Sequence, residues 1–321
     1  MAIIPEGYFS TYSIIARDPE TGQFGVAVQT HQMSVGAAVP WLEPGIGAVA
    51  TQAMTNISFG PRGLALLSKN MPAPEVLRVL IESDKDANLR QVAIIDGEGN
   101  VATWTGENCI PVANHHNGDG YSVQANMMTN ATVIPAMITS FEAGKGDFAQ
   151  RLLDALMAAE NEGGDIRGMQ SASIKIVPGA RLGEDSAAEQ RSLYDLRVDE
   201  HVDPLEELIR LVRLQRAQLL DMEGHEDLEE NEIRSAMQKW EEARTMAPEL
   251  EEMGFWQAVA LVDKTDELQL AAKIFASMPI GVERQTFWID LIGRLELCGL
   301  IETSGAGEKL ISVIKNGEFN N

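Results

Sequence analysis

Two hydrophobic patterns alternate along roughly the first 200 residues of the chain. Short apolar runs bounded by turn residues predict strands, and longer segments with apolar residues three and four positions apart predict helices. The predicted strands lie at residues 11–15, 24–28, 37–39, 47–53, 91–95, 101–104, 121–127, 172–177 and 193–198. The predicted helices lie at residues 61–69, 73–82, 132–141 and 148–160. The order is therefore strands, two helices, strands, two helices, strands.

This order favours a four-layer sandwich. Two mainly antiparallel sheets can stack face to face while each helix pair covers one outer face. The nearly continuous apolar runs at 48–50 and 93–95 suit strands that are packed on both sides. We therefore predict an α+β fold, an αββα sandwich, for residues 1–202.

Beyond Asp203 and Pro204 the pattern is helical throughout. The segments 205–220, 231–246, 255–262, 267–278 and 287–297 predict helices, and the acidic run at 221–230 predicts a solvated loop or helix surface. Asp203 and Asn231 are each expected to cap the helix that follows. Residues 203–321 are thus predicted to form an all-helical domain of solenoid-like helical hairpins.

Composition narrows the classes of function. Apolar residues make up 45% of the chain and charged residues 23%, which is typical of a globular protein. A net charge of −23 repels phosphate backbones and anionic lipids, so we expect neither a nucleic-acid nor a membrane partner. With two cysteines and no targeting or membrane-spanning pattern, the sequence indicates a cytoplasmic protein. The helical faces make a homo-oligomer the expected state.

Several stretches of the first part resemble an uncharacterised bacterial and archaeal family, the domain of unknown function 1028. The resemblance covers roughly residues 11–203. It includes Gly45-Ile-Gly-Ala-Val-Ala-Thr-Gln-Ala53 and Tyr121-Ser-Val-Gln-Ala-Asn126. The other matching stretches are 11–19, 21–22, 25–28, 35–36, 39–41, 60–64, 90–92 and 163–172.

The resemblance implies the fold and chemistry of the N-terminal-nucleophile hydrolases. In that class a Thr, Ser or Cys at the free start of a strand attacks an amide carbonyl, and its own α-amine accepts the proton. By position, Thr11 is similar to the residue that opens the first strand of the family. Ten residues precede it, so this chemistry requires cleavage between Ser10 and Thr11.

Other polar residues are candidates for the same site. Gln124 and Asn126 alternate on one strand, so their amides point the same way and could hold an oxyanion or simply satisfy buried backbone. A site of this class places a positive charge beside its nucleophile. No lysine precedes Lys69, so Arg17 is the candidate for a fixed charge that binds substrate. The Arg17-Asp18 pair also suits a turn.

A second set of candidates follows a glycine-ended helix. Asp165 and Arg167 can pair across a turn, either as a structural ion pair or beside a pocket, with Ser171 as a neighbouring hydroxyl. His31, just after the second strand, is a candidate to line a substrate entrance, although a lone histidine often caps or lies on a surface. His115 and His116 are adjacent in a strand and face opposite ways, so we expect no metal, and no motif indicates a cofactor.

Two main functions remain open at this point, beside a third in which the protein is an enzyme that uses another site around Asp165, Arg167 and His31. The first is a hydrolase of a non-protein amide, with a small-molecule substrate and Thr11 as nucleophile after cleavage. The second is a non-catalytic binding or scaffolding protein that keeps the sandwich and binds a protein partner through its helical half.

Overall fold

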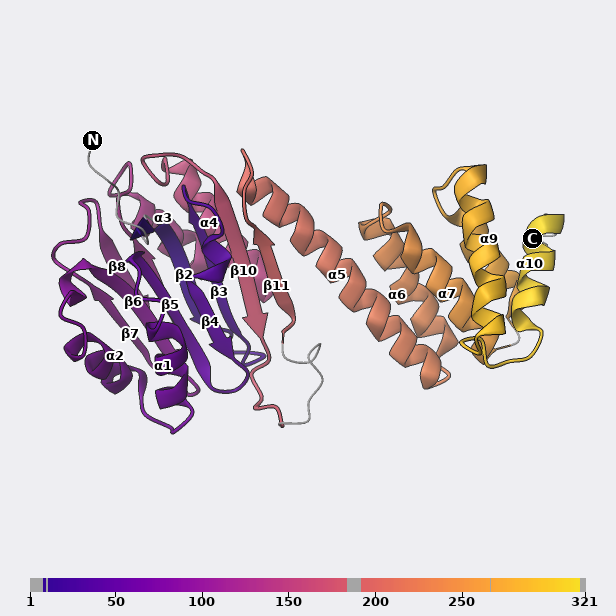
Figure 1. Cartoon of the computed structure of the whole chain (residues 1–321), viewed down its shortest axis with the longest axis horizontal. Helices are drawn as coiled ribbons and strands as arrows, with labels where there is room; N and C mark the ends of the chain where they lie inside the picture. Colours follow the sequence, from indigo (N-terminus) through magenta and orange to yellow (C-terminus); the bar gives the residue numbers. More distant parts are fainter. Residues whose placement is uncertain (1–7, 10, 184–191, 266, 318–321) are drawn as a thin grey trace. The chain divides into compact units, whose positions relative to one another are not determined.

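The computed structural model describes residues 8–9, 11–183, 192–265 and 267–317. The chain divides into two compact units, Met1–Val212 and Arg213–Asn321. Helix α5 (Pro204–Glu229) contains the division. The first unit holds two sheets with helices, and the second is helical in its described part (Figure 1). The α+β class predicted from the sequence is therefore confirmed.

The first sheet has five strands, with the order β1-β5-β6-β7 and with β4 paired to β5. Every pairing among them is antiparallel. These strands are β1 (Tyr8–Phe9), β4 (Pro40–Glu43), β5 (Gly47–Met54), β6 (Arg90–Asp96) and β7 (Val101–Thr105).

The second sheet has six strands in the order β11-β10-β3-β2-β9-β8, again all antiparallel. Its central strands are buried along their whole length because both faces are covered. The strands are β2 (Thr11–Arg17), β3 (Phe24–Thr30), β8 (Asn114–Gly118), β9 (Tyr121–Ala125), β10 (Ser171–Val177) and β11 (Tyr194–Val198).

Two helix pairs complete the four layers. Helices α1 (Phe59–Leu67) and α2 (Ala73–Glu82) contact β5, β6 and β7 of the first sheet, beside which Figure 1 draws them. Helices α3 (Val133–Ala143) and α4 (Phe148–Asn161) contact β2, β3, β9 and β10 of the second sheet. The αββα sandwich is thus the observed arrangement.

The alternation of side chains along β5 shows how the layers are separated. Ala48 and Ala50 belong to the hydrophobic cluster between the two sheets, whereas Val49 belongs to the cluster under α1 and α2. On the other side, a Cβ at Gly25 would come within 2.5 Å of Leu152 of α4. A glycine on β3 is therefore needed for α4 to pack this closely.

The strand predicted at 37–39 is wrong. Residues Val35–Ala37 form a 3-10 turn, η1, and the strand β4 begins at Pro40, in the segment expected to be a loop. A Cβ at Gly36 would meet the Arg197 side chain at 2.6 Å, so a close packing contact holds the turn. Pro40 is tolerated because it is the first residue of an edge strand.

Two short strands carry patterns too weak to predict. β8 is a polar strand, Asn-His-His-Asn-Gly, and β1 has only two residues. β9 ends at Ala125 rather than at Met127, which adopts a left-handed backbone with φ 58°. Pairing with neighbouring strands, not local hydrophobicity, determines these segments.

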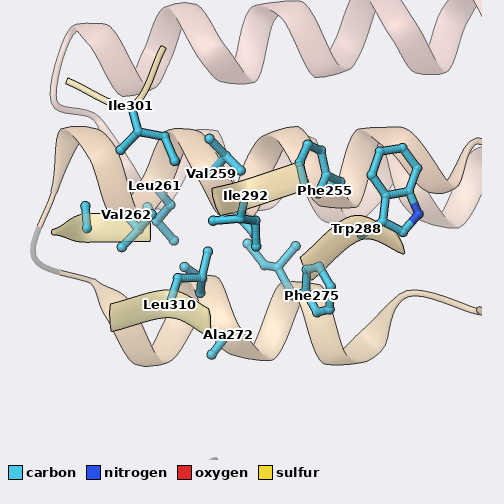
Figure 2. Packing of buried hydrophobic residues seen from close by; sticks show 14 of the residues in the cluster. Phe255, Val259, Leu261, Val262, Ala272, Phe275, Trp288, Ile292, Ile301 and Leu310 are labelled. Atoms are coloured by element: carbon cyan, nitrogen blue, oxygen red, sulfur yellow. The ribbon is translucent and has the colours of Figure 1, made fainter. Parts of the chain in front are cut away.

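In the second unit the helix Glu251–Lys264 packs against the helix on each side of it in sequence, and the helix Ala306–Asn316 packs against the three helices before it. Its core contains Phe255, Trp288 and Leu310, which Figure 2 shows from close by. The helices are α6 (Ile233–Met246), α7 (Glu251–Lys264), α8 (Leu268–Ser277), α9 (Val282–Leu297) and α10 (Ala306–Asn316). No helix in the described part of the chain is both long enough and apolar enough to cross a membrane.

The predicted helix ends have mixed outcomes. The Asp203 carboxylate accepts a hydrogen bond from the Glu206 amide at 3.1 Å, which confirms its role as a cap. Asn231 is not the cap of α6, because its backbone is left-handed and Glu232 occupies that position. The acidic run predicted as a loop or helix surface is helical, since α5 continues to Glu229, and α10 was not predicted.

Candidate functional site

A row of polar side chains crosses four neighbouring strands at one end of the second sheet. Thr11 of β2 lies opposite Thr30 of β3, and Thr30 lies opposite Ser171 of β10. On the other side of β2, the Asn126 backbone N–H donates to the Thr11 carbonyl at 3.1 Å. All four residues are fully buried. Four adjacent strands thus end in hydroxyl or amide side chains within the core.

Two glutamines of the first sheet meet this row. Gln52 of β5 and Gln91 of β6 are direct cross-strand partners, and the Gln52 amide donates to the Gln91 carbonyl oxygen at 2.7 Å. The Gln52 amide also donates to the Thr11 carbonyl at 3.2 Å, and the Ser13 hydroxyl donates to Gln52 at 2.6 Å. These bonds join the two sheets through polar groups where an apolar core would be expected.

The network continues from Gln91 toward β8. The Gln91 amide donates to the Thr105 hydroxyl at 2.8 Å and to the Ala125 carbonyl at 3.0 Å. The Thr105 hydroxyl lies 2.9 Å from Nδ1 of His115. Burial, together with the neighbouring His116, lowers the pKa of His115 below its ordinary value. The histidine at the end of this chain is thus a neutral hydrogen-bonding group at neutral pH.

The two amides predicted to bind an oxyanion are both in this network, in different positions. The Asn126 amide donates to Gln91 at 3.0 Å and lies 3.5 Å from the Thr11 carbonyl oxygen. The Gln124 amide donates to the Ser13 hydroxyl at 2.6 Å and is therefore occupied one step further from Thr11. Asn126 is the better placed of the two.

The Thr11 hydroxyl differs from the Ser13 and Ser171 hydroxyls, which are hydrogen-bonded. Its oxygen is buried and has no hydrogen-bond partner among the residues that the structure describes. Leaving a buried hydroxyl without a partner costs about 1–3 kcal/mol. The residues that directly follow Gln52 and Asn126 are Ala53 and Met127, whose left-handed backbones have φ of 63° and 58°. Unpaired groups and backbone strain of this kind concentrate at functional sites.

Asp165, Arg167 and His31 form a second cluster. The Asp165 carboxylate binds the Arg167 guanidinium through two contacts, at 3.1 and 2.8 Å, and accepts the His31 backbone amide at 3.1 Å. Nδ1 of His31 lies 3.1 Å from the Met169 carbonyl oxygen. The cluster connects the end of β3 to the segment that leads into β10. Its groups are used to hold these loops together.

Tyr12 is near this second cluster. Burial, followed by the Glu160 and Asp165 charges, raises the pKa of Tyr12 well above its ordinary value. Because successive side chains of a strand alternate, Tyr12 points away from the face that carries Thr11. Asp165 makes no hydrogen bond to the Thr11 hydroxyl, which has no partner among the described residues.

The remaining two candidates have structural surroundings. The Ser171 hydroxyl lies in the row but accepts the Val35 amide at 3.1 Å and donates to the Gln32 carbonyl. Arg17 is the last residue of β2, six positions after Thr11, or roughly 20 Å along an extended strand. Its guanidinium lies over the Phe24 ring, 5.9 Å from the centroid. The structure thus separates Arg17 from Thr11.

Sequence reasoning did not single out Gln52, Gln91 or His115 as members of a site. Gln52 follows Ala48 and Ala50 at intervals of two, so the strand pattern places it on the inner face. A polar residue that ends an inward-facing apolar series was the available signal. Among the described residues, no group of three or more His, Cys, Asp or Glu side chains is placed to hold a metal ion.

The fold and this layer define an αββα sandwich with a buried polar site between the ends of its two sheets. Residues 11–208 match the family described as a family of unknown function, DUF1028, and the chain belongs to it. The chain is also similar to a crystal structure of protein SPO2555 from Silicibacter pomeroyi, described with the same family. That match has 29% identity and a TM-score of 0.56, and covers 63% of this chain and 88% of the other. No curated protein matches the sequence.

Proposed function

We propose that this protein is an amide hydrolase of the N-terminal-nucleophile class, in which Thr11 becomes the nucleophile once the Ser10–Thr11 bond is cut. The observation that carries the proposal is the Thr11 hydroxyl, which is buried at the first position of β2 and lacks a partner among the described residues. A nucleophile is the role that leaves it free in the absence of substrate.

The surroundings of Thr11 supply the remaining parts of such a reaction. The freed α-amine, with a pKa of about 8, takes the hydroxyl proton as the oxygen attacks the amide carbonyl. The Gln52 and Asn126 amides, 3.2 and 3.5 Å from the Thr11 carbonyl oxygen, are the candidate donors for the oxyanion. The C–N bond then breaks, the amine leaves with the proton, and water hydrolyses the ester on Thr11 to a carboxylic acid.

Burial supports an amide of a small molecule rather than of a folded protein. Thr11, Thr30 and Asn126 are each 0% exposed, so the nucleophile lies between the sheets and not on a surface. A folded protein cannot present a peptide bond at that depth. A short, slender amide can.

The test uses a chain in which the bond before Thr11 becomes a protease site. Four substitutions, Pro5→Glu, Glu6→Asn, Gly7→Leu and Ser10→Gln, keep Tyr8 and Phe9 and create a site for a viral protease that recognises Glu-Asn-Leu-Tyr-Phe-Gln. This protease cuts directly before Thr11. We expect the cut protein, but not the uncut one, to be acylated once by a β-lactone, a reagent that acylates nucleophilic hydroxyls, with peptide mass spectrometry placing the adduct on Thr11.

Two variants complete this test. Thr11→Ala should lose the adduct and lower amide hydrolysis about 10,000-fold or more, as removal of a nucleophile does. Thr139→Ala, which removes an exposed hydroxyl of α3, should react like the parent. A cut, folded protein that is not acylated at Thr11 contradicts the proposal. An intact mass that begins at Met1 or Ala2, for protein made in its own host, contradicts it equally.

A further inference from the structure

The strand β1 occupies one edge of β5 immediately before the proposed nucleophile. Ala53 pairs with Arg90 of β6 on one side and with Phe9 of β1 on the other. Ala50 likewise pairs with β6 on one side and with Pro40 of β4 on the other. β1 and β4 therefore share the edge of β5 that β6 leaves open, with β4 beside residues 47–50 and β1 beside residues 53–54.

Residues 53–54 have no other strand partner on that edge in the described part of the chain. β4 cannot extend to them, because it begins at Pro40, which has no N–H to donate, and the chain before it turns through η1. Removal of residues 1–10 would thus leave the backbone groups at Ala53 and Met54 open on one side. An open edge of this kind binds extended peptide segments by adding a strand.

β1 runs toward Thr11 in the direction that the acyl part of a substrate would take. β1 pairs antiparallel with β5, runs toward Thr11, and ends one residue before the bond that the proposed function requires to be cut. A segment that follows the same track brings its terminal carbonyl to the Thr11 hydroxyl. The two residues before that carbonyl then lie opposite Ala53 and Met54.

This part of β5 is held firmly. The Arg90 guanidinium donates to the Met54 carbonyl at 2.6 Å and to the Asp84 carboxylate at 2.9 Å. Burial alone would raise the pKa of Asp84, but hydrogen bonds from Arg90, the Asp86 amide and Asn56 lower it to about 2. The ion pair therefore stays charged at neutral pH. A strand edge fixed in this way loses little freedom when it binds a ligand.

We propose, on the basis of the function proposed above, that the acyl part of the substrate is an extended, peptide-like segment with at least two backbone amides. It pairs with Ala53 and Met54 in the place that β1 occupies in the uncut chain. The substrate class is a short oligoamide, and simple acyl amides such as acetyl compounds lack the groups that would bind the edge.

The test compares substrates on the cut protein. Acetyl-Tyr-Phe-Ser anilide should be hydrolysed with a kcat/KM about 100-fold above that of acetyl anilide, since each strand hydrogen bond contributes about tenfold. Successive N–H groups of a strand point to opposite edges, so only one of the Tyr and Phe N–H groups faces β5. N-methylation of that residue removes its hydrogen bond to β5. One methylated substrate should lose about tenfold or more, and the other serves as its matched control.

A binding measurement separates this inference from the proposed function. A synthetic peptide of residues 1–10 should bind the cut Thr11→Ala protein, which has no nucleophile, and one of its two N-methyl forms, at Tyr8 or Phe9, should bind at least tenfold more weakly. Equal binding of all three peptides, or none, overturns the inference even if amides are hydrolysed. Selective binding by a cut protein that is not acylated at Thr11 contradicts only the hydrolase.

Discussion

The two ends of the layer between the sheets differ in composition although the same strands build both. At one end Thr11, Gln52 and Gln91 face one another in a hydrogen-bonded network. Further along β2 and β5, Ile15 and Ala48 belong to a purely hydrophobic cluster with Phe24 and its neighbours. The same antiparallel strand pairs build both ends, so the difference lies in the inward-facing side chains and in the left-handed backbones of Ala53 and Met127.

The apolar end contributes stability, whereas the polar end has the features of a functional site. Apolar burial contributes roughly 25 cal/mol per Å², whereas buried polar groups at best recover the cost of leaving water. The apolar end is thus sufficient to hold the sheets together. The polar end, with its unpaired Thr11 hydroxyl and the left-handed Ala53 and Met127, costs stability and has the features of a site.

The largest expected effect on stability lies at the apolar end. Ile15→Ala should lower the free energy of unfolding of the first unit by about 3 kcal/mol, because it leaves a cavity among fully buried neighbours. Urea unfolding of the full chain measures this change. Ile57→Ala, at a side chain that is 49% exposed, is the control and should cost much less. Equal losses for both would contradict the contrast between core and surface.

Breaking the polar network should cost less. Gln52→Met keeps the volume but removes the bonds to Ser13 and Gln91, and should lower the free energy of unfolding by about 2 kcal/mol. The half-buried Gln23, at the far end of the sandwich, provides the matched change Gln23→Met, with an expected cost well below 1 kcal/mol. An unchanged free energy of unfolding in Gln52→Met would show that the network is not needed for folding.

Thr11→Val should act in the opposite direction. It replaces an unpaired buried hydroxyl with a methyl group of similar shape, so the free energy of unfolding of the uncut chain should rise by about 1 kcal/mol. Thr103→Val is the comparison, because that hydroxyl bonds both Asn117 and Ser122 and its loss should destabilise. A destabilised Thr11→Val would mean that the hydroxyl has a partner.

The smallest effect concerns pH. Burial, with His116 beside it, lowers the pKa of His115 below its ordinary value of 6.5, so the unfolded chain binds this proton at a higher pH than the folded one. The stability that depends on neutral His115 is therefore fully present above about pH 6.5 and is lost as pH falls toward the folded pKa. His115→Gln should make the free energy of unfolding less dependent on pH between 7 and 5. An unchanged pH dependence of the free energy of unfolding would show that neutral His115 does not contribute to stability.

Parts of the site could be predicted from the sequence because they depend on local pattern. Thr11 opens a strand and Asn126 directly follows one, and both strands are recognisable from alternation and turn residues. Gln52 and Gln91 lie in stretches that resemble the family, but nothing local indicates that they meet Thr11. Asp165 and Arg167 were expected to pair and do so, without a hydrogen bond to the Thr11 hydroxyl.

The sequence by itself determined most of the order of strands and helices, the sandwich class and the helical second unit, because hydrophobic periodicity is a property of each segment alone. Tertiary structure decided which residues became neighbours. Thr11 meets Asn126, 115 positions away, and Gln52, 41 positions away, only through strand register and the stacking of the sheets. The pairing of β1 with β5 also depends on this stacking, because a two-residue strand has too few contacts to form without the edge that receives it.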